Sequence, residues 1–287
     1  MAGTAVVTGA NSGIGLATAL RLATDGFDVW AGSRSEAGLT AIAEAAAAAG
    51  LANLRPIQID VTSDASVAAA FAEVQADGPV AVLVNNAGIT GAGSVEETPI
   101  ATYQAMFDTN VLGVVRCTQA VLPGMREAKA GRIVNISSSS AITGPPLMAA
   151  YSSTKRAVEG ISESLQAEVA PFGIRVIAIQ AGTILTPIWG KSEVPAEDTA
   201  YPKARDFLLK VLSHQLMNSG VPPETVADAI AAAIEDDAPP LRHVVGDAKV
   251  LAAMREAHGD DVIEVHFLDD EDFPVRYAEL SGIDYWA

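Results

Sequence analysis

The sequence contains one cysteine, Cys117, so the chain cannot form an internal disulfide bond. It has no apolar run of the roughly 18 residues that a membrane-spanning helix requires. Its first residues carry no basic segment of the kind that opens a secretory signal, and a strand-like run begins at once with Thr4. The lack of disulfides fits a reducing compartment. We therefore expect a soluble, cytoplasmic protein without a membrane span.

Positive charge is scarce, because 18 Lys and Arg stand against 35 Asp and Glu and give a net charge of −17. This acidity repels phosphate backbones and argues against nucleic acids and anionic membrane surfaces as partners. The acid is concentrated in a C-terminal extension, residues 247–287, which has 11 acidic and 3 basic residues. We interpret the extension as a solvated tail, with a partner-binding or metal-binding tail as the alternative. The sequence predicts no metal site.

Apolar, β-branched runs alternate with amphipathic helical patterns along most of the chain. The run from Val80 to Val84 is continuously apolar, as in a strand that is buried on both faces. The alternation predicts a single α/β domain over residues 1–287, with a doubly wound parallel sheet and helices on both faces. Within it, one long helix is expected from about Pro99 to Met125, with Asn110 near its middle. Ligands bind such sheets beyond the carboxyl ends of the strands.

The regular pattern loosens between residues 187 and 220, where Trp189, Tyr201 and Phe207 are interspersed with prolines and charges. A long, weakly patterned segment beside a ligand site indicates a lid over the substrate. The apolar character of this lid favours a lipophilic substrate. Core packing would account for the same residues about as well.

Three glycines follow the first predicted strand with the spacing Gly-x-x-x-Gly-x-Gly, at positions Gly9, Gly13 and Gly15. A helical pattern follows immediately. Glycines at a strand–helix junction let the backbone approach a pyrophosphate, and the helix N-terminus presents free N–H groups to it. The spacing predicts a dinucleotide site, and an ordinary tight turn is the alternative. It differs from the Gly-x-Gly-x-x-Gly of the general fingerprint.

The second predicted strand ends in Ser33 and Arg34, and no acid stands at this position. Enzymes that prefer NAD place an acid here to bind the ribose 2′-hydroxyl. An arginine instead fits a 2′-phosphate through charge-assisted hydrogen bonds. We therefore predict NADP(H) over NAD(H), and a solvated loop arginine is the alternative.

Tyr151 and Lys155 stand four residues apart in a helical pattern and so share one helix face. A cation beside a phenol lowers its pKa from about 10 toward the working pH. A tyrosine with a lowered pKa can exchange a proton with a substrate oxygen. Alone, this spacing is also common on solvated helices.

Several motifs occur together in one order: Thr-Gly-x-x-x-Gly-x-Gly from Thr8, Asn-Asn-Ala-Gly from Asn85, then Asn110, a serine thirteen residues before Tyr151, and Tyr-x-x-x-Lys. In this order they resemble the short-chain dehydrogenase/reductase family over roughly residues 4–186. The resemblance implies a Rossmann-like fold with about seven parallel strands. It also implies a catalytic tetrad of Asn110, Ser138, Tyr151 and Lys155, with Ser139 as the fallback for Ser138.

The resemblance further implies a set of cofactor-binding residues. In addition to Tyr151 and Lys155, these are Gly9, Asn11, Ser12, Gly13, Ile14, Gly15, Ser33, Arg34, Asp60, Val61, Asn86, Ala87, Gly88, Gly182, Ile184 and Thr186. One departure is Ala181, because the family usually has Pro-Gly after the sixth strand. The turn loses the fixed φ of proline, and we expect a looser nicotinamide pocket.

Residues 85–185 also resemble, more loosely, the branch that contains 17β-hydroxysteroid and retinol dehydrogenases. The implied activity is NADP(H)-dependent interconversion of a secondary alcohol and a ketone, or an alcohol and an aldehyde, on a lipophilic small molecule. The alternative is a catalytically silent NADP(H)-binding sensor or scaffold of the same fold. Members of the family pair the long helices after the fourth and fifth strands, so a homodimer or homotetramer is expected.

Overall fold

The computed structural model describes residues 3–190, 195–268 and 271–286. Its centre is a seven-stranded sheet in the order β3-β2-β1-β4-β5-β6-β7, in which every pairing is parallel. This confirms the predicted doubly wound sheet. The order reverses between β1 and β4, so the ligand crevice belongs there. The strands are β1 (Thr4–Val7), β2 (Asp28–Ser33), β3 (Leu54–Gln58), β4 (Val80–Asn85), β5 (Gly131–Ser138), β6 (Ile174–Ala181) and β7 (Arg242–Val245).

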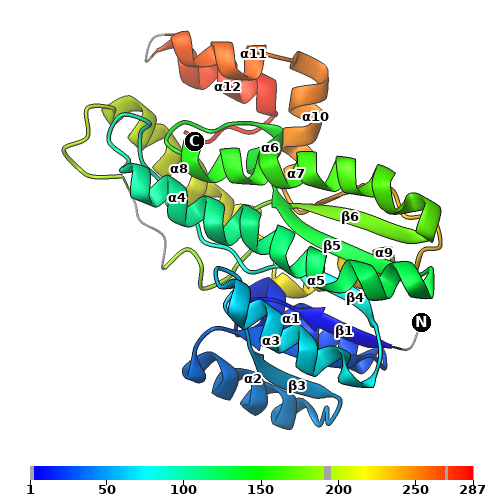
Figure 1. The fold of residues 1–287 in the computed structure, drawn as a ribbon. Helices are drawn as coiled ribbons and strands as arrows, with labels where there is room; N and C mark the ends of the chain where they lie inside the picture. The colour runs from blue at the N-terminus through cyan, green and yellow to red at the C-terminus, as the bar shows by residue number, and fades with distance from the viewer. Residues whose placement is uncertain (1–2, 191–194, 269–270, 287) are drawn as a thin grey trace.

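Helices cover both faces of the sheet, and each face has its own apolar core (Figure 1). Successive residues of a strand point to opposite faces, so Ala5 and Val7 enter one core and Val6 the other. The first core is covered by α1 (Gly13–Thr24), α2 (Glu36–Ala49) and α9 (Pro223–Glu235). The second is covered by α3 (Asp64–Val74), α5 (Gly113–Ala128) and α7 (Ala149–Val169).

The long helix expected around Asn110 is interrupted. It consists of α4 (Ile100–Phe107), a π-helical turn (Asp108–Leu112) and then α5. Asn110 lies within the π-helical turn and is buried. π-Helical turns are rare and concentrate at functional sites, because the widened turn leaves backbone groups and side chains free of the regular helical pattern. The interruption therefore marks Asn110 as a residue to place in the site.

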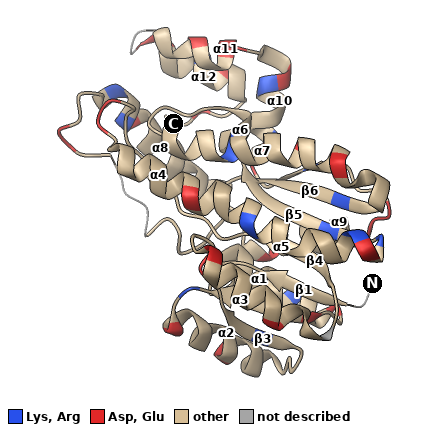
Figure 2. Cartoon of the chain, viewed as in Figure 1, with Lys and Arg blue, Asp and Glu red and all other residues tan. Residues whose placement is uncertain are grey.

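The C-terminal extension is folded, so its interpretation as a solvated tail was wrong. It forms α10 (Ala248–His258), α11 (Asp261–Glu264) and α12 (Asp272–Ser281), which lie together at one end of the molecule (Figure 1). Apolar and aromatic side chains between the acids pack into a third core with Phe207, while charged residues line α10 to α12 (Figure 2). The composition of the extension did not reveal this core, because the acidic residues lie on its outer surface. Asp269 and Asp270 of the acidic run lie outside the described residues.

The segment predicted as a lid, residues 187–220, contains a regular helix, α8 (Pro202–Asn218). Phe207 of α8 makes edge-to-face contacts with Phe273 and Tyr277 of α12, at centroid distances of 5.4 and 5.0 Å. Residues 191–194 of this segment lie outside the described residues. In the described part of the chain, no helix has the length and apolar character to cross a membrane. The same residues contain no group of three or more His, Cys, Asp and Glu placed to hold a metal ion.

Candidate active site

The turn between β1 and α1 requires glycine for two different reasons. Gly9 and Gly13 have φ values of +63° and +55°, in the left-handed region that side chains disfavour. Gly15 is needed because of a close approach, since a Cβ there would lie 2.4 Å from Nδ2 of Asn86. The turn thus provides an open backbone concavity before the N-terminus of α1. A diphosphate fits such a concavity.

The β1 turn is tied to the segment that follows β4. The Oγ1 of Thr8 accepts hydrogen bonds from the backbone N–H groups of Asn86 and Ala87, both at 3.0 Å. In return, Nδ2 of Asn86 donates to the carbonyls of Thr8 and Gly9, at 2.9 and 3.0 Å. The Asn86 amide therefore braces the glycine turn. Its backbone and that of the next two residues line the groove described next.

A polar groove of about 350 Å³ runs over the carboxyl ends of β1 to β4. Most of the predicted cofactor residues line it, and Gly15 lies beneath it rather than in its wall. The predicted residues in its wall are Gly9, Asn11, Ser12, Gly13, Ile14, Ser33, Arg34, Asp60, Val61, Asn86, Ala87, Gly88 and Thr186. Sequence reasoning missed Ser35, Ile59, Thr62, Ile89, Thr109 and Ile188.

The end of the groove beside β2 carries an available cation. Arg34 is exposed and, among the residues that the structure describes, forms no hydrogen bond or ion pair. Ser33 is buried beside it, and its hydroxyl contacts the carbonyl of Ser35 at 3.4 Å. A Cβ on Gly38 would lie 2.0 Å from that hydroxyl, so α2 packs closely under this corner. The arrangement can accept an anion on the groove side.

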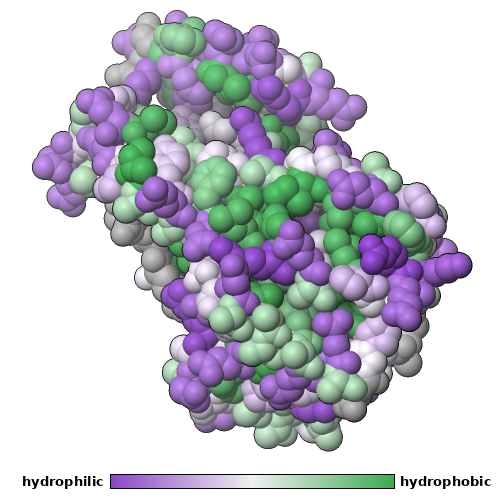
Figure 3. Space-filling view, viewed as in Figure 1, coloured by the Kyte–Doolittle hydropathy of each residue, from purple (hydrophilic) through white to green (hydrophobic). Residues whose placement is uncertain are grey.

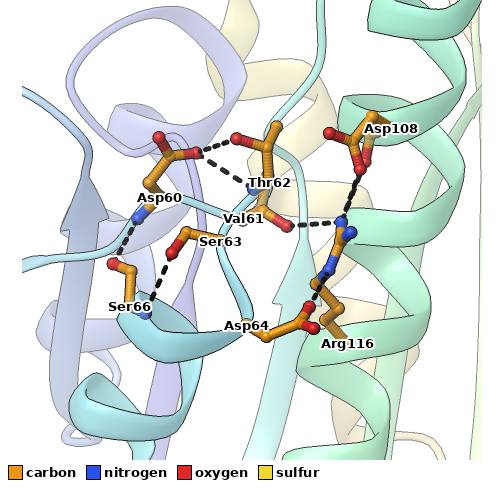
Figure 4. A network of polar contacts seen from close by, with 8 residues as sticks. All are labelled: Asp60, Val61, Thr62, Ser63, Asp64, Ser66, Asp108 and Arg116. Carbon is orange, nitrogen blue, oxygen red and sulfur yellow. Dashed lines mark hydrogen bonds and ion pairs between the residues drawn. The ribbon is translucent and has the colours of Figure 1, made fainter.

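Asp60 and Arg116 organise the middle of the groove (Figure 4). The Asp60 carboxylate accepts hydrogen bonds from the backbone N–H and the hydroxyl of Thr62, at 3.0 and 2.8 Å, and these bonds lower the pKa of Asp60. Arg116 of α5 donates to the carbonyl of Val61 at 3.1 Å and pairs with Asp64 and Asp108, whose carboxylates lie on either side of its guanidinium. Arg116 thereby joins the loop after β3 to the π-helical turn. Sequence reasoning did not identify this role.

Tyr151 and Lys155 share the face of α7 that points toward the carboxyl end of β5. The Lys155 Nζ lies 5.6 Å from the centroid of the Tyr151 ring and donates a 2.7 Å hydrogen bond to the carbonyl of Ile136. Burial lowers the pKa of Lys155 to about 8. Burial also raises the pKa of Tyr151, against a smaller lowering by hydrogen bonding to Ser138. The expectation of a lowered tyrosine pKa was therefore wrong for the cofactor-free protein, because desolvation of the phenol outweighs its neighbours.

Ser138 and Asn110 complete the group predicted from the sequence. Ser138 ends β5, is buried, and accepts a 3.1 Å hydrogen bond from the backbone N–H of Ser140. Asn110 donates to the carbonyl of Ile89 at 2.9 Å and to Oγ1 of Thr154 at 3.1 Å, and accepts from the N–H of Ile89 at 2.8 Å. Thr154 stands beside Lys155 on α7. The amide of Asn110 is thus fixed between the segment after β4 and the helix that carries Tyr151 and Lys155.

A second cavity of about 210 Å³ lies over β5 and β6, and Ser138 and Tyr151 form part of its wall. The remaining wall is mostly apolar, and α8 and the C-terminal extension contribute part of it together with the segments that follow β4, β5 and β6. The cavity and the polar groove have Ile14, Thr186 and Ile188 in common, so they are continuous. The predicted residues Gly182 and Ile184 line this cavity, and Lys155 lies behind both spaces. Sequence reasoning missed the lining residues Thr90, Met148, Gln215, Leu251, Val262, Ile263, His266 and Tyr277.

A family model for short chain dehydrogenases matches residues 3–196. The chain belongs to the short-chain dehydrogenase family. It is 40% identical to the uncharacterized oxidoreductase YusZ of Bacillus subtilis, over 79% of this chain and 82% of that protein. It is 36% identical to human retinol dehydrogenase 8, over 83% of this chain and 80% of that protein. It is also 34% identical to rat estradiol 17-beta-dehydrogenase 1, over 96% and 84% of the two chains. The predicted resemblance to the family is confirmed.

Solved structures of the short-chain dehydrogenase family match the same architecture. A short-chain dehydrogenase from Streptomyces avermitilis aligns with a TM-score of 0.82 and 34% identity, over 93% of this chain and 96% of that one. An actinorhodin polyketide ketoreductase, solved with NADPH, aligns with a TM-score of 0.74 and 33% identity, over 85% and 95% of the two chains. This chain is accordingly an oxidoreductase of the nicotinamide-dependent type. The concavity at Gly9, Gly13 and Gly15 fits that cofactor.

Proposed function

We propose that the protein is an NADP(H)-dependent reductase that interconverts a ketone or aldehyde and the corresponding alcohol on a lipophilic small molecule. The observation that carries the proposal is the junction of the two spaces. The polar groove and the apolar cavity meet at Ile14 and Thr186, and Ser138 and Tyr151 stand in the wall of the cavity. A cofactor in the groove and a carbonyl in the cavity would therefore meet beside a phenol and a hydroxyl.

In the proposed reaction, the bound cofactor supplies the hydride, and the protein supplies the proton and the orientation. Tyr151 donates its phenolic proton to the carbonyl oxygen, and Ser138 donates a hydrogen bond to the same oxygen. One such donor to a developing oxyanion contributes about 3 kcal/mol. Lys155 would hold the nicotinamide ribose, and Asn110 would anchor a water that relays protons to Lys155. In the reverse direction, Tyr151 accepts the proton of an alcohol.

The electrostatics of the free protein support the reductive direction. Because burial raises the pKa of Tyr151, its phenol stays protonated near neutral pH, which is the form that donates to a carbonyl. Oxidation needs the phenolate first, and a nearby positive charge stabilises it in addition to the hydrogen bond with Ser138. The positive charges of a bound oxidised nicotinamide and of Lys155 are the candidates. We therefore propose reduction as the faster direction at neutral pH.

For the cofactor, we propose a preference for NADP(H), supported by the free guanidinium of Arg34 at the end of β2. The groove end beside it has Ser33 and Ser35, and Arg34 interacts electrostatically with the Asp60 carboxylate in the same groove. The Asp60 carboxylate is turned to Thr62 (Figure 4). The ratio of kcat/KM for NADPH to that for NADH tests this preference, and a ratio below one contradicts it.

For the substrate, we propose a lipophilic carbonyl compound with a second polar group. The cavity wall is mostly apolar, but His266 and Tyr277 also line it. Within the described parts of the chain, neither side chain makes a hydrogen bond, so both can bind a substrate hydroxyl or carbonyl. Burial lowers the pKa of His266, which keeps the ring neutral and disfavours a cation in this wall.

A panel of carbonyl compounds tests the proposed function. Steroid, retinoid, long-chain acyl and sugar carbonyls, each compared with its analogue lacking the second polar group, would be incubated with NADPH while its absorbance at 340 nm is followed. We expect turnover of lipophilic compounds and a lower KM for those with the second polar group. Binding of NADPH without turnover across the panel would favour the alternative, a silent sensor or scaffold.

We also propose a cytoplasmic homodimer or homotetramer that pairs through α4, α5 and α7. Apolar side chains gather on the face that carries these helices (Figure 3), and Ile100, Leu112 and Phe172 are exposed on or next to them. Light scattering on the purified protein tests the assembly, and a monomer at micromolar concentration contradicts it.

Cys117, the single cysteine, is buried, and burial raises its pKa to about 12, so it stays an unreactive thiol.

A further inference from the structure

The turn after β6 lacks the proline expected in the family, yet the structure shows it firmly held. Ala181 replaces that proline, and a looser turn was the expectation. The backbone N–H of Gly182 donates to the carbonyl of Val245 at 3.0 Å. The N–H of Thr183 donates to Oδ1 of Asp247 at 2.6 Å. The turn is therefore fixed by the hydrogen bonds that it donates to β7 and to the residue that precedes α10.

The carboxylate of Asp247 also reaches a second segment. Its Oδ2 accepts a 3.1 Å hydrogen bond from the hydroxyl of Ser219, which follows α8. Two residues on, the N–H of Val221 donates to the carbonyl of Thr183 at 3.1 Å, and the carbonyl of Val221 accepts from Leu185 at 2.9 Å. One carboxylate and one short parallel bridge thus hold the turn.

Gly182 shows how closely Asp247 approaches. A Cβ at this glycine would lie 1.9 Å from Oδ1 of Asp247 and 2.6 Å from the backbone nitrogen of Ala248. Its φ is not in the left-handed region, so backbone conformation does not require glycine here. Glycine is required because the carboxylate and the start of α10 occupy the place of a side chain. The close contact therefore depends on both residue types: glycine at position 182 leaves the space, and the Asp247 carboxylate occupies it.

We infer that Asp247 is a positioning residue that holds the turn carrying Ile184 and Thr186 against the nicotinamide end of the groove. Its hydrogen bonds restrain the turn from a neighbouring segment, whereas a proline at position 181 would restrain the turn through its own fixed φ. Because Asp247 directly precedes α10, the same carboxylate joins this turn to the extension that forms the cavity wall. The inference rests on the proposed cofactor site, and Asp247 itself touches neither cofactor nor substrate.

The affinities for two ligands distinguish an effect at the nicotinamide end of the site from an effect at its adenosine end. NADPH occupies both ends, whereas 2′-phospho-ADP-ribose lacks the nicotinamide ring and reaches the nicotinamide end only with its terminal ribose. Affinity for each would be measured by calorimetry on the wild type and on Asp247→Ala. We expect the variant to bind NADPH about tenfold more weakly, the size of effect seen when a charged hydrogen-bond partner is lost. Its affinity for 2′-phospho-ADP-ribose should stay within about twofold of the wild type, because no contact at that end changes.

Asp236→Ala is the matched control, because Asp236 also accepts a backbone N–H, from Ala238 at 2.8 Å, in the loop before β7 and away from both spaces. It should bind both ligands like the wild type. Asp247→Asn keeps the side-chain shape and carries the test if the alanine variant does not fold; we expect an intermediate loss for NADPH only. Equal losses for the two ligands, or unchanged NADPH affinity, would overturn the inference. A wild type that binds neither NADPH nor NADH would instead refute the cofactor site itself.

Discussion

The polar groove and the apolar cavity are built from different materials. The groove lies at the ends of four neighbouring strands, and its shape comes from glycine turns that the side chains of Thr8 and Asn86 tie together through hydrogen bonds to backbone groups. The cavity is closed by side chains from α8 and the C-terminal extension, which are distant in sequence and pack through aromatic contacts. A backbone-lined groove tolerates many sequences, whereas a wall of side chains changes with each substitution. The contrast is consistent with our proposal that the groove binds the cofactor and the cavity selects the substrate.

The side chains of the two regions also differ in their charge states. Hydrogen bonds from Thr62 lower the pKa of Asp60 in the groove, so that side holds an ionised group. In the extension, burial lowers the pKa of His266 and raises that of Tyr285 to about 12, so both stay neutral near pH 7. An uncharged wall suits the uncharged substrate that we propose for the cavity.

Removing the phenol where the two regions meet should have the largest effect. Tyr151→Phe should lower kcat by about a thousandfold, because general acid catalysis contributes factors of about 10² to 10⁴. NADPH binding should change little, since the groove keeps its turns. Single-turnover kinetics and NADPH fluorescence would measure the two quantities. Tyr103→Phe on α4, outside both spaces, is the control and should keep its rate. A Tyr151→Phe variant with most of its activity would remove the tyrosine from the mechanism.

The next largest effect tests whether the two regions are energetically separate. Phe207→Ala removes a buried ring from the third core and should destabilise the extension by about 3 kcal/mol. We expect a raised KM for the carbonyl substrate and an unchanged Kd for NADPH, measured beside thermal unfolding. Phe267→Ala is the matched control, because that ring is 84% exposed. Loss of NADPH affinity in step with substrate affinity would break the distinction between groove and cavity.

The sequence predicted the groove well because its determinants are local. Gly9 and Gly13 adopt backbone conformations that their own residue type permits. Tyr151 and Lys155 share a face because four residues make about one helical turn. The parallel, doubly wound sheet followed from the alternation of patterns. These features need no knowledge of what packs against them.

The cavity was poorly predicted because its determinants are tertiary. His266 and Tyr277 reach the wall only after the extension folds back over α8, and the acids around them concealed the core. Arg116 joins segments that lie 52 residues apart in its pair with Asp64. The pKa of Tyr151 likewise depends on burial rather than on spacing along α7. The spacing along the sequence indicates which residues lie near one another, but not how far burial removes each side chain from water.

A smaller effect is expected at the adenosine end of the groove. Arg34→Ala should lower the preference for NADPH over NADH by about tenfold, because one charge-assisted contact to the 2′-phosphate is lost. Affinity for NADH should stay within about twofold. The ratio of kcat/KM for the two cofactors measures the change. Arg55→Ala is the control, since Arg55 stacks over Trp30 outside the groove. An unchanged ratio in Arg34→Ala would leave the preference without its proposed residue.

The smallest effect concerns Lys155, which lies behind the junction of the two regions. Its folded pKa of about 8 is below the ordinary 10.5, so the fold disfavours its ammonium form. The unfolded chain binds more protons above pH 8, and stability conferred by this group therefore rises with pH. From pH 7 to 9 the cofactor-free protein should gain about 1 kcal/mol from it. Denaturant unfolding at several pH values would show this gain as a difference between the wild type and Lys155→Met. Exposed Lys249→Met should retain the wild-type slope, and equal slopes for all three proteins would mean that Lys155 titrates as if solvated.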